Sequence, residues 1–201
     1  MPTSLCFPCS TKKIAQATAV LLQQEPNKKT KYIRILKMLY RADRESIQEI
    51  GVPIIGIPTW ALPKGPLHSK IKNLIKHEPA PDPEAEECPT KEEFQLWDTF
   101  FEVRVHTIKL IKDPGISQLS EYDIEKLTTI SRRYKGKDPW SPVHDSHEFP
   151  EWKEKQALGP DSNQIYLDDI LKALGMIGQK GSIEELMSMS NAAENVFGTR
   201  D

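Results

Sequence analysis

Residues 31–70 read KYIRILKMLYRADRESIQEIGVPIIGIPTWALPKGPLHSK and hold the strongest structural signals in the chain. Apolar residues recur at helical spacing from position 33 to position 50, and Gly51 is a typical residue just beyond a helix C-terminus. Between positions 33 and 40 almost every residue is apolar, whichever side of the helix it is on. This pattern predicts a central, buried helix rather than a peripheral one.

The rest of this stretch predicts an irregular crossing and a second helix. Residues 52–60 contain two prolines and a glycine, so they cannot form a regular helix, but a short edge strand would tolerate proline. We expect the next helix to begin near Pro66, because proline suits the first helical turn. A helix start beside Lys64 and Gly65 is a candidate anion site. It lacks the second glycine and the Lys-Ser/Thr pair of a nucleotide-binding P-loop.

Capping residues and helical spacing predict six more helices, and alternation of apolar and polar residues predicts a strand. The strand, residues 101–111, is expected to pair with the extended segment at 54–60. Pro150 is expected to break the chain, and residues 153–164 to form a loop. The six helices are predicted at residues 11–24, 91–100, 121–135, 139–147, 166–174 and, from a Ser182–Glu185 capping box, 182–196.

These elements predict an α+β fold that is mostly α-helical, with a small two- or three-stranded antiparallel sheet in a compact helical domain. We expect an irregular lead-in at residues 1–10, a single domain at 11–190 and a frayed tail at 191–201. Inside the domain, the acidic and proline-rich residues 78–90 are expected to form an exposed loop.

Composition and charge exclude several classes of protein. The formal net charge is −2 and opposite charges are mixed along most of the chain, so there is no electrostatic case for binding nucleic acid. No apolar run approaches the roughly 18 residues that span a bilayer, and the N-terminus is not that of a secretory signal. Three cysteines argue against a disulfide framework. We therefore expect a cytoplasmic protein with no membrane partner.

The cysteines offer half of a metal site. Cys6 and Cys9 form a CxxC, which supplies two of the four ligands of a structural zinc ion. Cys88 could be a third ligand, with His77 or His106 as a fourth. Because no second CxxC is present, two reduced thiols near a flexible end are the simpler interpretation, and we expect no metal.

A second candidate for chemistry is the cluster His144, His147 and Glu148. A metalloprotease needs the order HExxH, whereas this order is HxxHE. Elsewhere, no serine or cysteine has a base placed to activate it. We expect no catalytic residue and no cofactor, and we keep a metal-dependent enzyme built on this cluster as an alternative.

Six segments stand in a characteristic order: QA at 16–17, LKMLYRADRE at 36–45, GVPIIG at 51–56, ALPKGPL at 61–67, LS at 119–120 and HDSHEFPEW at 144–152. Together they resemble the Panacea (SocA-like) antitoxin domain, a family also found in prophages and mobile genetic elements. The resemblance covers roughly residues 12–187. The chain departs from the family pattern at Lys64, in the long acidic loop and in the CxxC lead-in.

The resemblance implies a non-enzymatic antitoxin of a toxin–antitoxin system, which neutralises a cognate protein toxin by direct binding. One member of the family instead delivers its toxin to an ATP-dependent protease, so an adaptor is the alternative. The motif residues are implied mainly to hold the fold, since the family's toxins differ widely. They are Lys37, Asp43, Gly65, Pro66, His144, His147, Glu151 and Trp152.

A surface that binds a toxin needs exposed apolar or aromatic anchors. Within residues 31–70, the candidates are Tyr32, Met38, Tyr40, Trp60 and Lys64. Trp60 also suits the core. Substitution of a true anchor would abolish binding and leave the fold intact, whereas substitution of a core residue would unfold the chain.

Overall fold

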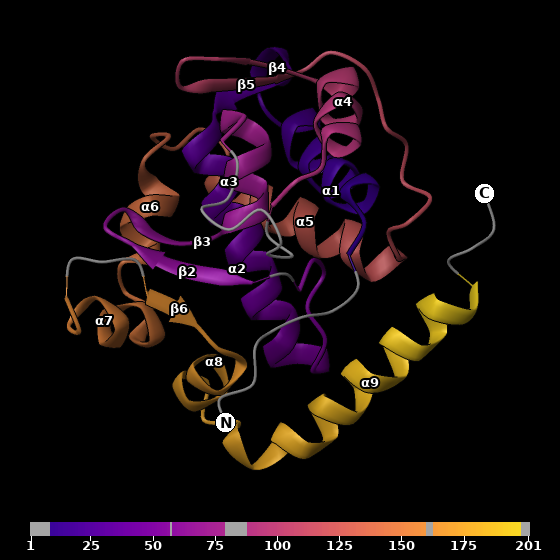
Figure 1. Ribbon diagram of the computed structural model, residues 1–201. Coiled ribbons are helices and arrows are strands. Elements are labelled where there is room, and N and C mark those ends of the chain that lie inside the picture. The colour runs from indigo at the N-terminus through magenta and orange to yellow at the C-terminus, as the bar shows by residue number, and fades with distance from the viewer. Residues whose placement is uncertain (1–8, 57, 79–87, 160–162, 198–201) are drawn as a thin grey trace.

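The computed structural model describes residues 9–56, 58–78, 88–159 and 163–197 of the chain (Figure 1). Within these ranges the chain forms nine α-helices and two three-stranded antiparallel sheets, which confirms the predicted, mostly helical class. Most of the predicted lead-in and acidic loop lies outside the described residues, and so does Cys6 of the CxxC. No helix in the described ranges is long and apolar enough to cross a membrane.

Helix α2 (Tyr32–Ile50) lies at the centre of the molecule, as its sequence predicts (Figure 1). Helices α1 (Thr11–Gln23) and α5 (Glu121–Tyr134) pack against it and enclose the main hydrophobic core. Ser10 is the N-cap of α1, and its hydroxyl accepts a hydrogen bond from the first turn. Helix α2 ends at Gly51, where φ is +76°, a conformation that favours glycine.

The first sheet has the strand order β1–β5–β4, and its strands are β1 (Lys29–Lys31), β4 (Phe101–Arg104) and β5 (Thr107–Leu110). The single strand predicted at residues 101–111 is therefore a hairpin. Its expected pairing with residues 54–60 is wrong, because β5 pairs with β1 instead. A three-residue strand such as β1 is too short to show the alternation that would reveal it.

The second sheet has the order β3–β2–β6, with β2 (Thr59–Leu62) between β3 (Gly65–His68) and β6 (Asn163–Ile165). The helix predicted to begin near Pro66 is wrong at its start, because Pro66 belongs to β3. Helix α3 (Ser69–Lys76) begins three residues later. Strand β3 is an edge strand, where a residue without a backbone N–H is tolerated.

The C-terminal third contains α6 (Ser141–Ser146), α7 (Pro150–Gln156), α8 (Leu167–Ala173) and α9 (Lys180–Phe197). The loop predicted at residues 153–164 is wrong at both ends: α7 extends into it and β6 ends it. Pro150 starts α7 instead of breaking the chain, because a proline at the first helical position loses no hydrogen bond. Helix α9 begins two residues before the expected Ser182 cap.

Two capping boxes define the starts of other helices. Thr90 caps α4 (Lys91–Phe100), and its hydroxyl and backbone N–H both bond to Glu93. Ser120 and Asp123 form the same reciprocal pair at the start of α5, as the sequence predicts. Two 3-10 turns, η1 (Pro26–Lys28) and η2 (Ile177–Gln179), precede β1 and α9.

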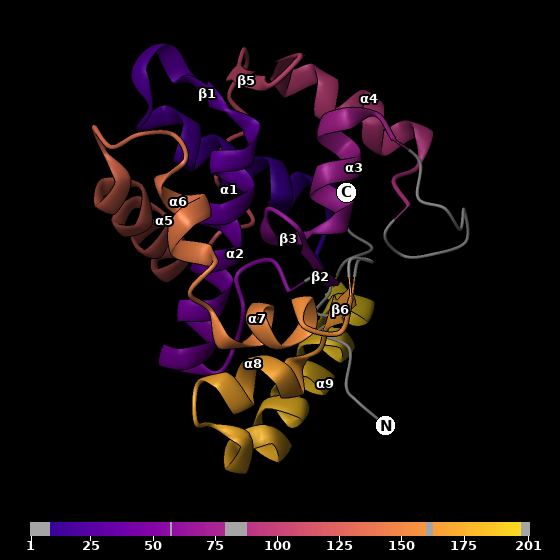
Figure 2. The same cartoon turned by 90° about the vertical axis from the view of Figure 1, so that its left-hand side faces the viewer.

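The described residues form two hydrophobic clusters. The larger surrounds α1, α2 and α5, and the smaller lies where β6, α8 and the start of α9 meet the end of α2. Figure 2 shows α7, α8 and α9 as a layer at one end of the body. The smaller cluster consists of Ile47, Ala61, Ile165, Leu167, Ile170, Leu171 and Ile183.

Candidate partner-binding site

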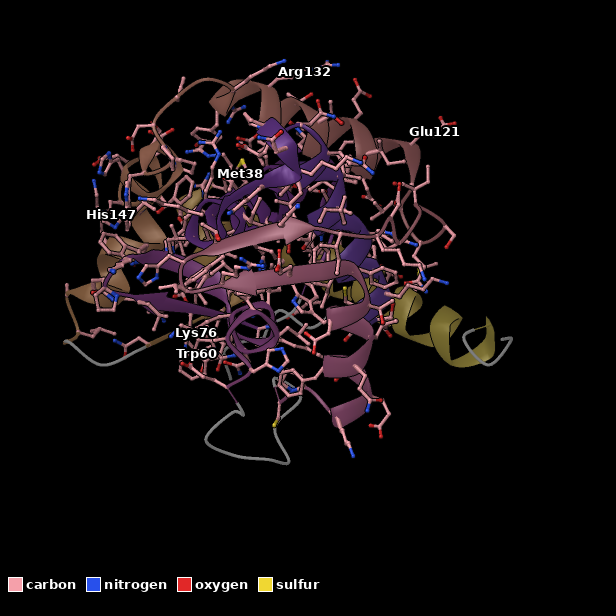
Figure 3. The ribbon with its side chains drawn as sticks, turned by 90° about the horizontal axis from the view of Figure 1, so that it is seen from above. Met38, Trp60, Lys76, Glu121, Arg132 and His147 are labelled. Atoms are coloured by element: carbon pink, nitrogen blue, oxygen red, sulfur yellow. The ribbon has the colours of Figure 1, made fainter. Side chains whose placement is uncertain are left out.

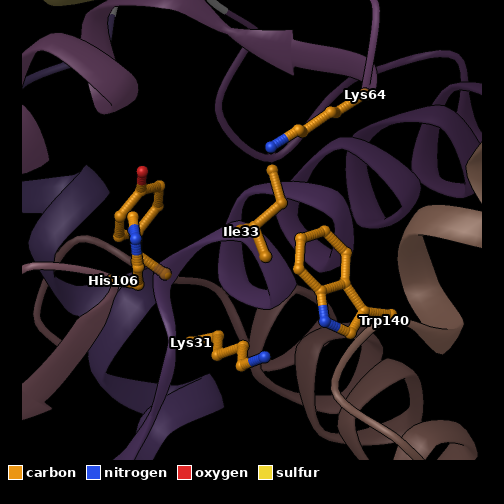
Figure 4. Close-up of a pocket in the computed structure, with 6 residues that line it drawn as sticks. Lys31, Ile33, Lys64, His106 and Trp140 are labelled. Atoms are coloured by element: carbon orange, nitrogen blue, oxygen red, sulfur yellow. The ribbon is translucent and has the colours of Figure 1, made fainter.

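A pocket of about 220 Å³ opens on the surface beside the start of α2 (Figure 4). We call it the Trp140 pocket. Its residues come from the end of β1, the first turn of α2, the β2–β3 turn, the β4–β5 turn and the residue that precedes α6. Segments far apart in the sequence therefore meet here. The lining residues are Lys31, Tyr32, Ile33, Lys64, His106 and Trp140.

Trp140 forms the aromatic wall of the pocket and is half-buried. Its backbone N–H donates to the Asp138 carboxylate at 2.7 Å, which fixes the residue at the start of α6. The ammonium nitrogens of Lys31 and Lys64 lie 5.0 and 5.7 Å from its ring centroid. In Figure 4 the two lysines approach Ile33 and Trp140 from opposite sides. The wall thus combines apolar area with two cations.

The opposite wall is tied to the β4–β5 turn. The backbone N–H of Tyr32 donates to the His106 carbonyl at 3.0 Å, and the rings of these two residues are 6.3 Å apart. Beside His106, Val105 has φ +45° and is 85% exposed. A β-branched residue in this backbone region is strained, and such strain is often found at functional sites.

The two lysines of the pocket have no carboxylate within 4.0 Å in the described part of the chain. The arginines of α2, by contrast, pair with carboxylates: Arg34 bonds to Glu25 and Arg44 to Glu151, at 2.7 and 2.8 Å. The charge of Lys31 and Lys64 is therefore available to a ligand, whereas the paired arginines hold the fold together.

A buried lysine holds the β2–β3 turn in place. Lys37 on α2 is 1% exposed, and its ammonium donates to the Pro66 carbonyl at 2.6 Å. Burial lowers the pKa of Lys37 well below its usual value. Gly65 lies against this side chain, because a Cβ on Gly65 would be 3.2 Å from the Lys37 ammonium. These contacts fix the β2–β3 turn that carries Lys64.

Asp43 holds the irregular crossing against α2. Its carboxylate accepts hydrogen bonds from the backbone N–H groups of Ile54, Ile55 and Gly56 at 3.0, 2.8 and 2.8 Å. The Nε2 atom of buried His68 lies 3.1 Å from the same carboxylate. One acidic side chain thus satisfies three buried donors in a segment without regular structure.

Glu151 joins α7 to α2 inside the molecule. Its carboxylate accepts from the Tyr40 hydroxyl and from Arg44 Nε, both at 2.8 Å. Burial and the Glu151 carboxylate raise the pKa of Tyr40 well above its usual value. Nearby, Trp152 Nε1 donates to the Leu62 carbonyl at 2.9 Å. These contacts of the motif residues are all internal to the fold.

The predicted toxin-binding residues fall into two groups. Tyr32 and Lys64 line the Trp140 pocket. Met38 is 0% and Tyr40 1% exposed, so both predictions of a surface anchor are corrected; Figure 3 labels Met38 within the body of the molecule. Trp60 is half-buried on the central strand of its sheet, between β3 and β6.

The histidine cluster is not assembled around a common point. His147 stacks on Trp152 with ring centroids 4.4 Å apart, Glu148 pairs with Lys153 at 2.7 Å, and His144 is exposed. Burial and the positive charges of Lys37 and His144 lower the pKa of His147. Over the described ranges, no three His, Cys, Asp or Glu residues are placed to hold a metal ion.

Sequence reasoning did not identify Lys31, His106 and Trp140 as one site. Each lies at the end of a short element, and the turns that bring them together carry no periodic pattern. The only signal was composition, since Trp140 stands as an isolated aromatic residue after Asp138 and Pro139 in a polar segment.

A family model described as "Antitoxin SocA-like, Panacea domain" matches residues 35–153, which is more than half of the chain. No curated protein and no solved structure matches. The matched range contains Lys64, His106 and Trp140, and it begins just after Lys31, Tyr32 and Ile33.

Proposed function

Because the chain belongs to the SocA-like Panacea antitoxin domain family, we propose that it is a cytoplasmic antitoxin that neutralises a cognate toxin by direct protein–protein binding. The Trp140 pocket is the surface proposed to contact the toxin. The motif residues Lys37, Asp43 and Glu151 are buried in the fold and do not touch the toxin.

The observation that carries this proposal is the composition of the pocket. Tryptophan and tyrosine are the residues on which protein–protein binding energy concentrates, and a pocket that can exclude water around them is typical of such anchors. Here Trp140 and Tyr32 stand beside unpaired lysines at the surface. Tyr32 and Lys64 are retained as contact residues, and Lys31, His106 and Trp140 are added.

The proposal is tested by expressing this protein together with the protein of the neighbouring gene, each from its own inducible promoter. The neighbour alone should stop growth, and co-expression should restore it. Trp140→Ala should abolish the rescue and weaken binding by about thirtyfold or more, as for an interface hot spot. The matched control is Ile116→Ala, because Ile116 is 52% exposed and is not part of the pocket.

The result that contradicts the proposal is a neighbour that is harmless alone, or growth arrest that wild-type protein does not relieve. Circular dichroism and the melting temperature of Trp140→Ala show whether the loss is one of contact or of folding. A pulse–chase measurement of toxin half-life separates blocking from delivery. An unchanged half-life supports neutralisation by binding, and a shortened one supports the adaptor.

A further inference from the structure

We propose that the Trp140 pocket recognises an acidic segment of the partner protein that carries an apolar side chain. This inference rests on the proposed function and adds to it the chemistry of the partner. Carboxylates of the segment pair with Lys31 and Lys64, and the apolar side chain packs against Ile33 and Trp140. Figure 4 shows the pocket side chains that would make these contacts, with the two ammonium groups on either side of Ile33 and Trp140.

The positive charge extends beyond the pocket. A neighbouring hollow of about 480 Å³ shares Lys31 with it and adds Lys29 and Lys137. Of the residues that line this hollow, Glu25 alone is acidic, and it is bonded to Arg34 at 2.7 Å. Lys29 and Lys137, like Lys31 and Lys64, have no carboxylate within 4.0 Å over the described ranges.

The positive face contrasts with the charge of the chain as a whole. The whole chain has a formal net charge of −2, so its general field does not attract anions. The acidic residue closest in sequence to Trp140 is Asp138, whose carboxylate already accepts the Trp140 N–H. A cationic face on an otherwise slightly acidic protein steers and orients a partner of complementary charge.

The geometry favours a protein segment over nucleic acid. Nucleic acid binding draws on a row of phosphate contacts, often six to ten, and arginine is prominent among the side chains that make them. Here four lysines line the Trp140 pocket and the neighbouring hollow. Arg34, the arginine that lines the neighbouring hollow, is bonded to Glu25. The Trp140 pocket, with a volume of about 220 Å³, has room for single side chains. An acidic segment with one apolar residue would use both the lysine charges and the apolar pocket.

The test uses defined probes and does not need the toxin. The purified full-length protein, labelled with ¹⁵N, is titrated with the acetylated and amidated peptide Glu-Glu-Leu-Glu-Glu. Its neutral isostere Gln-Gln-Leu-Gln-Gln and single-stranded deca-thymidylate are titrated in parallel. Binding is followed by the amide signals of Lys31, Tyr32 and Lys64 and by the indole N–H of Trp140.

We expect the acidic peptide to shift these signals and the neutral peptide to bind at least tenfold more weakly, with affinity falling as salt is raised. The double variant Lys31→Glu/Lys64→Glu should bind the acidic peptide at least tenfold more weakly than wild type. The matched control is Lys12→Glu/Lys91→Glu, which reverses two exposed lysines outside the pocket and should bind like wild type.

Equal binding of the two peptides, no binding of the acidic peptide, or tighter binding of the thymidylate at the same residues would overturn the inference. The double variant also separates the two proposals in the growth assay. If wild type protects and Lys31→Glu/Lys64→Glu protects equally, the antitoxin proposal stands and this inference fails. If the peptide binds as expected but wild type does not protect, the pocket chemistry stands and the antitoxin proposal fails.

Discussion

At the scale of single residues, Gly65 is restricted both by its backbone conformation and by its packing. Its φ is +91°, and a Cβ placed there would collide with Ser146 Oγ and come within 3.2 Å of the Lys37 ammonium. Because Gly65 has no side chain, buried Lys37 has the space to reach the Pro66 carbonyl. Packing and backbone conformation therefore both require glycine at the turn that presents Lys64.

Gly65→Ala should lower the free energy of unfolding by about 2 to 4 kcal/mol, because a strained backbone and a steric clash coincide. Urea denaturation monitored by tryptophan fluorescence measures the change. Gly51→Ala is the matched control: its φ is +76°, but the nearest atom to a Cβ is Ile183 Cγ1 at an ordinary 3.4 Å. It should cost about 1 kcal/mol. Equal losses in the two variants would show that the contacts with Ser146 and Lys37 are unimportant.

At the scale of elements, the β4–β5 hairpin carries strain at its tip. Val105 has φ +45°, where a β-branched L-residue is disfavoured, and its side chain is 85% exposed and gains little from packing. Val105→Asn should therefore raise the free energy of unfolding by about 1 kcal/mol, since asparagine tolerates this conformation. The melting temperature should rise accordingly.

The control for the hairpin is Ile111→Asn, just beyond the other end of β5. Ile111 is 55% exposed, so it exposes apolar surface as Val105 does. Unlike Val105, its φ is not positive. This exchange should change the free energy of unfolding by less than about 0.5 kcal/mol. A gain at Ile111 as large as that at Val105 would mean that lost hydrophobic exposure, and not backbone strain, explains the effect.

The elements that the sequence predicts well are those with a long period or a strong cap. Helix α2 is visible because its apolar positions continue for almost five turns, and α5 because Ser120 and Asp123 mark its start. Strand β3 and helix α7 are hidden because each contains a proline, at Pro66 and Pro150. Whether proline ends an element or is tolerated in it depends on which neighbours supply hydrogen bonds, and that is a property of the tertiary structure.

Local sequence patterns likewise reveal only part of the candidate site. Tyr32 and Lys64 could be proposed because they belong to the most ordered stretch of the sequence. Met38 and Tyr40 were placed on the surface wrongly, because the pattern of α2 alone does not show how many neighbours cover it. The pocket itself depends on Trp140 meeting the two hairpin turns, and no local pattern encodes that meeting.

At the scale of the whole molecule, the family match ends before the fold does. It covers residues 35–153, whereas β6, α8 and α9 lie beyond it. These elements pack around the smaller hydrophobic cluster at one end of the body (Figure 2). The pairing of β6 with β2 joins them to the body, and Glu151 and Trp152 of the preceding α7 bond to Tyr40 and Leu62. The chain thus consists of a large core and a small, attached C-terminal layer.

This arrangement predicts that the C-terminal layer opens before the rest of the molecule. A small apolar cluster contributes less burial free energy than the core around α1, α2 and α5, so α8 should unfold locally while α2 stays folded. In native-state hydrogen exchange, the amides of Ile170 and Leu171 should show an opening free energy at least about 2 kcal/mol below that of Leu36 and Leu39.

Glu151→Gln should widen this difference in opening free energy, because it weakens the link between α7 and α2. Lys153→Gln on the exposed side of α7 is the control and should leave it unchanged. Equal opening free energies in α8 and α2 would mean that the two clusters unfold as a single cooperative unit.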